Sequence, residues 1–126
     1  MTKNIIIKTS VQKRFDSFMA HGRVLFFSAS CGFGKTVLAD ALLRGRNVLR
    51  QSAADPDCVI PPSAQDWDIL LIDDLQFMQE EAGQQALCEL IRSSPERRFV
   101  LLSRGVPPGC LTAFQYTGLM TVLEAD

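Results

Sequence analysis

The chain has 126 residues, 47% hydrophobic and 21% charged, which is an ordinary composition for one globular domain and excludes a disordered or fibrous protein. Its 13 Lys and Arg residues nearly balance its 14 Asp and Glu residues, and the net charge of −1 does not favour binding to nucleic acid or membrane through bulk electrostatics. No apolar run approaches the roughly 20 residues that cross a bilayer, and the first residues do not form a signal peptide. We therefore expect a cytoplasmic protein with no membrane partner, whose 4 cysteines are free thiols.

Apolar runs alternate with helix-period segments along the whole chain, a pattern that predicts an α/β domain with a mostly parallel sheet. The first helix is expected over residues 11–19, with Ser10 as its N-cap and Gly22 as its C-terminal stop. Two more helices are expected over residues 36–44 and 80–92. Five strands are expected to form the sheet, at residues 24–27, 47–50, 69–72, 98–102 and 119–123.

Single residues between these elements carry narrower expectations. Residues 51–68 contain several prolines and should form an irregular loop. Trp67, near the end of that loop, is expected to pack in the core, whereas Arg97 and Arg98 are expected to be solvated charges. Ala86 is expected on the buried face of the third helix.

The turn after the first strand carries the strongest chemical signal in the chain. Residues 29–36 fit the phosphate-loop pattern G-x-x-x-x-G-K-[ST], the Walker A motif, except that Ala29 stands where the first glycine is usual. Gly32 and Gly34 let successive backbone N–H groups turn inward around a phosphate. Lys35 supplies charge to the terminal phosphates, and the hydroxyl of Thr36 ligates Mg²⁺ where the next helix begins. The residues expected to bind the nucleotide are Ala29, Ser30, Cys31, Gly32, Phe33, Gly34, Lys35, Thr36 and Val37.

Two consecutive acids follow the apolar strand at residues 69–72. A carboxylate at the carboxyl end of a strand beside a phosphate loop can hold Mg²⁺ through water, as in a Walker B motif, and this role falls to Asp73. Asp74 is then placed to position the water that attacks the γ-phosphate. Either acid could instead merely cap the segment that follows, but the phosphate-loop motif upstream favours the metal site.

The strand at residues 98–102 is followed closely by Arg104. In a parallel sheet its carboxyl end faces the same crevice as the phosphate loop, so Arg104 can read the γ-phosphate. The alternative is a surface arginine that begins the next loop. We therefore assign catalytic roles to Asp74 and Arg104, and metal binding to Thr36 and Asp73.

Residues 28–36 resemble the phosphate loop of the MalT-like branch of LuxR-type transcription regulators, within the STAND class of signalling ATPases. That family also commonly has alanine in place of the first glycine and an aromatic residue between the last two. Residues 73–76 resemble its acidic strand end, although Gln76 stands where many relatives have histidine. Residues 102–108 and 118–126 resemble the rest of its nucleotide domain, so the likeness covers nearly the whole chain.

The resemblance implies a P-loop NTPase fold, with a five-stranded sheet flanked by helices, that binds ATP or ADP with Mg²⁺. It also implies slow, regulatory ATP hydrolysis that resets a signalling switch. Two alternatives stay open. Residues 69–78 also look like the acidic strand of DnaA-type replication initiators. A small P-loop phosphotransferase is the other alternative, but residues 74–83 lack the arginine that its lid would need.

Members of the regulator family continue past the nucleotide domain into a winged helix, a helical sensor array and a helix-turn-helix. We therefore expect residues 1–126 to be a single nucleotide-binding domain of a longer regulator, in which other domains bind DNA. Apolar side chains near the C-terminus are expected to make the isolated domain prone to self-association. They are Leu111, Phe114, Tyr116, Leu119 and Met120.

Overall fold

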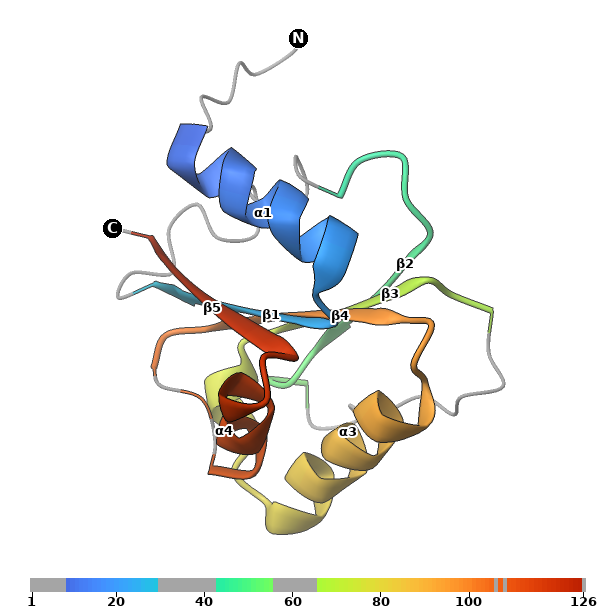
Figure 1. Ribbon diagram of the computed structural model, residues 1–126. Coiled ribbons are helices and arrows are strands. Elements are labelled where there is room, and N and C mark those ends of the chain that lie inside the picture. Colours follow the sequence, from blue (N-terminus) through green and yellow to red (C-terminus); the bar gives the residue numbers. More distant parts are fainter. Residues whose placement is uncertain (1–8, 30–42, 56–65, 106, 108, 126) are drawn as a thin grey trace, which may run out of the picture.

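The computed structural model describes residues 9–29, 43–55, 66–105, 107 and 109–125, which form the helices and strands of Figure 1. In chain order these elements are α1 (Thr9–His21), β1 (Val24–Ala29), β2 (Val48–Ser52), β3 (Ile69–Asp73), the 3-10 helix η1 (Leu75–Phe77), α3 (Glu81–Ser93), β4 (Arg98–Ser103), α4 (Gly109–Tyr116) and β5 (Met120–Ala125). The helix predicted over residues 36–44 lies almost wholly outside the described residues. Within the described part of the chain, no helix is long and apolar enough to cross a membrane.

The five strands form one sheet in the order β2-β3-β4-β1-β5, and every neighbouring pair is parallel. The predicted five-stranded parallel sheet is therefore confirmed. β4 lies between β1 and β3, because its Leu101 pairs with Phe26 on one side and with Ile72 on the other. Since all strands are parallel, their carboxyl ends meet at a single edge of the sheet.

Helices cover both faces of the sheet, with α1 on one face and α3 and α4 on the other (Figure 1). Successive strand residues point to opposite faces, and the buried side chains divide into two clusters accordingly. Leu70 and Ile72 of β3 pack in the cluster that contains α3 and α4, whereas Leu71 packs with Phe15 and Phe18 of α1. A strand buried on both faces reads as a continuous apolar run, which is the pattern of β1, β3 and β4.

The end of α1 is set by close packing. Gly22 follows the last helical residue as predicted, and its N–H donates to the carbonyl of Phe18 at 2.7 Å. A Cβ at Gly22 would lie 2.9 Å from Cδ1 of Phe18, so the buried ring leaves room only for glycine. The other end differs from expectation: α1 begins at Thr9, and Ser10 lies inside the first turn instead of capping it.

The second strand is longer than predicted. Gln51 and Ser52 belong to β2 and pair with Ile72 and Asp73 of β3, although the proline content of residues 51–68 favours a loop. Pairing with a buried central strand outweighs the loop signal at these two positions.

Expected burial in α3 is wrong at one position. Ala86 is exposed, and Cys88 takes a buried place beside Leu87 and Ile91. Residues three and four apart share a face of a helix, so the stripe that includes positions 87, 88 and 91 faces the sheet and position 86 faces outward.

The C-terminal stretch forms a helix that the sequence did not suggest. α4 buries Leu111 and Phe114 against the sheet, and β5 buries Met120. Of the five apolar residues expected to be exposed here, Tyr116, at 89% exposure, and Leu119, at 38%, remain at the surface. The apolar surface expected to drive self-association is therefore much smaller than the sequence predicts.

Trp67 packs in the core as predicted, with its ring edge-on to Phe99 at 5.8 Å between ring centres. Arg97 and Arg98, predicted to be solvated, are instead half-buried. The Arg97 guanidinium lies 4.1 Å from the centre of the Trp67 ring, and Arg98 donates to the carbonyl of Met19 at the end of α1. Arginine can cover apolar surface with its stem while its head finds an aromatic face or a carbonyl.

Cys88 and Cys110 are free thiols, in agreement with prediction, while Cys31 and Cys58 lie outside the described residues. The Sγ of Cys88 donates to the carbonyl of Cys110 at 3.5 Å. Burial raises the pKa of Cys88 to about 12, so the thiol stays protonated and fills space between α3 and α4.

Candidate functional site

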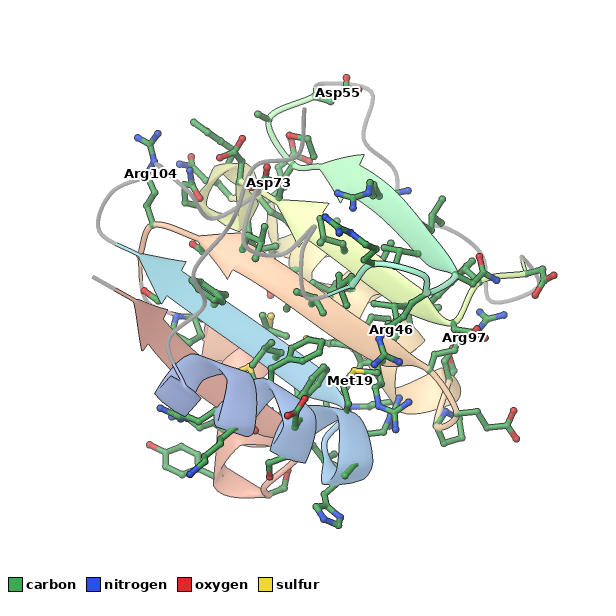
Figure 2. All side chains as sticks on the ribbon, turned by 90° about the horizontal axis from the view of Figure 1, so that it is seen from above. Met19, Arg46, Asp55, Asp73, Arg97 and Arg104 are labelled. Atoms are coloured by element: carbon green, nitrogen blue, oxygen red, sulfur yellow. The ribbon has the colours of Figure 1, made fainter. Side chains whose placement is uncertain are left out.

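The carboxyl edge of the sheet brings together the ends of β1, β3 and β4. Ser28 of β1 pairs with Ser103 of β4, and Asp73 follows the last residue of β3 that pairs with β4. Figure 2 shows Asp73 and Arg104 toward this edge, with Met19 and Arg97 nearer the other ends of the strands. The topology therefore places the predicted acid and the predicted arginine at the same edge of the sheet.

Asp73 and Asp74 occupy different backbone environments. Asp73 is the last residue of β3 and is half-buried, and its Oδ1 accepts a hydrogen bond from the N–H of Asp74 at 2.8 Å. Asp74 adopts a left-handed backbone conformation, with φ of 54° and ψ of 43°. Among residues other than glycine, Asp and Asn tolerate this conformation best.

The carboxylate of Asp74 does not cap the segment that follows. Asp74 stands at the N-cap position of η1, yet its side chain makes no capping hydrogen bond there. Its Oδ1 instead accepts from Nε2 of Gln76 at 3.4 Å. The simpler interpretation of Asp74, as a helix cap, is therefore not what the geometry favours.

Gln76 is the site residue that sequence reasoning missed. Its side chain is half-buried in η1, and its Oε1 accepts from the backbone N–H of Arg104 at 3.2 Å. The loop after β3 and the loop after β4 are thus linked through one amide group. The available signal was weak: a polar residue between Leu75 and Phe77, noticed only as a departure from the regulator family.

Further hydrogen bonds extend this linkage to β1. The N–H of Gly105 donates to Oγ of the buried Ser103 at 3.3 Å. The Oγ of Ser28 donates to the carbonyl of Gly105 at 3.2 Å. These bonds, together with those of Gln76, join the ends of β1, β3 and β4 in one hydrogen-bonded network. Ser28 directly precedes Ala29, where the predicted phosphate loop begins.

The predicted nucleotide-binding residues lie mostly beyond the part of the chain that the structure describes. Ala29 is the last residue of β1 and pairs with Ala125 of β5. Residues 30–37 are outside the described residues, so the roles of Lys35 and Thr36 stay predictions. Arg104 is exposed just after β4.

The described residues fit a magnesium ion held by few protein ligands. Asp73 offers a half-exposed carboxylate at the strand end, which is a hard oxygen ligand of the kind that Mg²⁺ prefers. Within the described residues, no group of three or more His, Cys, Asp or Glu side chains is arranged to hold a metal ion. Mg²⁺ usually keeps several waters and is completed by substrate phosphates, so one or two protein ligands suffice.

A separate pocket of about 460 Å³ lies near the opposite, amino-terminal edge of the sheet. Its lining includes Met19 at the end of α1, Arg46 before β2 and Arg98 at the start of β4, together with acidic residues. In Figure 2 Arg46 and Met19 lie well away from Asp73 and Arg104. This pocket is therefore distinct from the candidate site at the carboxyl edge.

No protein-family model and no curated protein matches this chain. Solved structures share its fold. Pif1 of Bacteroides sp., in complex with ADP-AlF4, is similar over 97% of this chain and 43% of that chain, with a TM-score of 0.59 and 15% identity. Drosophila ORC bound to AT-rich DNA and Cdc6 is similar over 91% of this chain and 55% of that chain, with a TM-score of 0.58 and 12% identity. Drosophila ORC bound to DNA gives 91% coverage of each chain, a TM-score of 0.57 and 11% identity.

The chain has the P-loop NTPase fold. This confirms the fold class predicted from the phosphate-loop motif and the alternating strands and helices. The chain spans about half the length of the Pif1 chain and of the ORC chain bound with Cdc6.

Proposed function

We propose that this chain is a nucleotide-binding switch domain that takes ATP or ADP with Mg²⁺ and hydrolyses ATP slowly. One observation carries the proposal: Asp73 ends β3, Asp74 follows it, and Arg104 follows β4, all at the sheet edge where β1 also ends and the phosphate-loop motif begins in the sequence. Ligands of open parallel α/β sheets bind at the carboxyl ends of the strands. The sheet order is compatible with a single site that contains the motif and the acids.

The proposed roles divide the chemistry among a few residues. Lys35 contacts the terminal phosphates, and Thr36 and Asp73 hold the Mg²⁺ ion, Asp73 through water. Bound Mg²⁺ neutralises charge on the β- and γ-phosphates. Asp74 orients the water for attack, and Arg104 reads the γ-phosphate from the adjacent loop.

The finer proposal is that the domain belongs to a MalT-like, LuxR-type transcription regulator of the STAND class. It rests on the resemblance of residues 28–36 and 102–108 to that family. In such regulators DNA contact belongs to a separate helix-turn-helix, which is compatible with a net charge of −1 in this chain. A cytoplasmic location follows from this proposal.

A replication factor of the DnaA type is the second candidate. Residues 69–78 resemble the acidic strand of those initiators, and two similar structures are of Drosophila ORC bound to DNA. The gene sequence downstream of this chain discriminates between the two. A terminal helix-turn-helix after a helical sensor array supports the regulator, and a lid domain with an oligomerisation arginine supports the initiator.

Replacing Lys35 tests the nucleotide site directly. Lys35→Ala removes a charge-assisted contact to phosphate, so ATP binding should weaken by about 1.5–3 kcal/mol. Calorimetric titration with ATP and Mg²⁺ measures this change. Lys13→Ala, on the exposed side of α1, is the matched control and should bind as the parent does. Equal affinity of the parent and Lys35→Ala would contradict the phosphate-loop assignment.

A further inference from the structure

The side chain of Gln76 uses both ends of its amide group, and the partners determine which end faces which. The backbone N–H of Arg104 can only donate, so it must face Oε1, at 3.2 Å. With Oε1 turned to that N–H, Nε2 faces Oδ1 of Asp74, at 3.4 Å. The amide is therefore oriented by its surroundings and joins an acid after β3 to the backbone after β4.

The turn that carries Gln76 closes without this side chain. The N–H of Phe77 donates to the carbonyl of Asp74 at 3.0 Å, and the N–H of Met78 donates to the carbonyl of Leu75 at 2.9 Å. The buried side chain of Leu75 anchors η1 in the core. Backbone hydrogen bonds and apolar packing thus hold the turn, and the hydrogen bonds of the Gln76 side chain connect two loops.

The link reaches the residues that the proposed function uses. Asp74 sits in a left-handed conformation, its carboxylate makes no capping hydrogen bond to η1, and its Oδ1 accepts a hydrogen bond from the side chain of Gln76. On the other side, the loop containing Arg104 continues to Gly105, whose carbonyl accepts from Ser28 of β1. A shift of either loop would be passed to the other through the amide.

We propose that Gln76 is a positioning residue, which holds the carboxylate of Asp74 and the loop of Arg104 in one fixed relation. The group that orients the attacking water and the group that reads the γ-phosphate then respond to the nucleotide as a unit. This inference rests on the proposed function, because it assigns Gln76 a role in the same site. It predicts that Gln76 matters more for the transition state than for the bound product.

The test compares binding of two probes, ADP with Mg²⁺ and ADP with Mg²⁺ and aluminium fluoride, which mimics the transferring phosphoryl group. The parent should bind the second probe more tightly than the first. Gln76→Leu keeps the size of the side chain but loses both hydrogen bonds. Its ADP affinity should stay unchanged, because the groups that Gln76 holds act on the γ-phosphate, which ADP lacks. Its preference for the aluminium fluoride complex should fall by about 10- to 100-fold, as expected for misplaced catalytic groups.

A second variant and a control separate positioning from general damage. Gln76→Glu keeps an acceptor for Arg104 but puts a carboxylate against Asp74, so it too should lose the preference. Hydrogen exchange at the Arg104 amide should rise in Gln76→Leu and stay low in Gln76→Glu, since only the second keeps the acceptor. Gln79→Leu, at an exposed position just after η1, should match the parent in every measurement.

The possible outcomes distinguish the two proposals. If the parent binds neither probe, the proposed function fails and this inference falls with it. If the parent binds ADP but shows no preference for the aluminium fluoride complex, or if both Gln76 variants keep that preference, the positioning role is overturned while nucleotide binding stands.

Discussion

Asp74 is the residue at which the backbone and the proposed chemistry meet. The backbone of Asp74 is left-handed where the chain leaves β3, and its carboxylate accepts a hydrogen bond from the side chain of Gln76 instead of capping the backbone of η1. Asparagine tolerates this conformation as well as aspartate does. An Asp74→Asn variant therefore removes the charge without disturbing the turn, which makes the roles of the two acids separable by experiment.

Asp73→Asn and Asp74→Asn should have different effects. Loss of the Asp73 charge weakens the metal site in the ground state and the transition state alike, so nucleotide affinity in Mg²⁺ and turnover should both fall. Asp74→Asn should spare binding and slow hydrolysis by about 10²–10⁴-fold, the usual effect of a positioned base or water-orienting group. Calorimetry and single-turnover hydrolysis measure the two quantities.

Asp66→Asn, an exposed position before β3, is the charge-matched control for this pair. Hydrolysis at the parental rate by Asp74→Asn, with loss only in Asp73→Asn, would remove the water-positioning role from Asp74.

The sequence predicted which acids lie at the candidate site but not the hydrogen bonds that link them to the rest of the site. Asp73 and Asp74 can be recognised from the sequence because they directly follow the apolar run at residues 69–72. Gln76 links the acids to the loop after β4 through Arg104, a residue 28 positions away in the chain. Arg97 and Arg98 illustrate the same limit, since their partners Trp67 and Met19 are brought close by the sheet and by α1.

At the scale of elements, α4 shows why a short helix can escape detection. It has only 8 residues, and it begins at Gly109, a poor helix former. Its buried positions, Leu111 and Phe114, are three apart and span less than one full turn, which is too little to define a helical period. The helix forms because β5 and α3 offer an apolar surface to it, so packing decides its structure more than local preference does.

Two aromatic residues of α4 test this account. Phe114 is 5% exposed and lies 5.4 Å below the guanidinium of Arg92, whereas Tyr116 on the same helix is 89% exposed. Phe114→Ala should lower the free energy of unfolding by about 3–5 kcal/mol, as large-to-small changes in a core do. Tyr116→Ala should change it by less than about 0.5 kcal/mol. Denaturant titration measures both, and similar losses in the two variants would mean that α4 is not docked as described.

At the scale of the whole molecule, the parallel sheet was predictable but the order of its strands was not. Continuous apolar runs in β1, β3 and β4 indicate strands covered on both faces, and that requires helices on both sides of a parallel sheet. Nothing in the chain order says that β4 lies between β3 and β1, because strand order is settled by packing between segments far apart in the sequence. That order joins Ser28, Asp73 and Ser103 at one edge and makes the network through Gln76 possible.

Because the helices on both faces pack on one shared sheet, we expect the chain to unfold as a single cooperative unit. A ligand that binds only the folded chain then raises the stability of the whole molecule. At 100 times its dissociation constant, ATP with Mg²⁺ should add about 2.7 kcal/mol, which is roughly 10 °C in the unfolding midpoint for a chain of this size. A thermal melt followed by circular dichroism measures this shift.

Adenosine at the same concentration should shift the midpoint far less, because the proposed site recognises phosphate through Lys35 and the backbone N–H groups of the loop. Equal shifts with ATP and adenosine would place recognition in the nucleoside instead, and no shift with either would mean that this sheet edge holds no nucleotide.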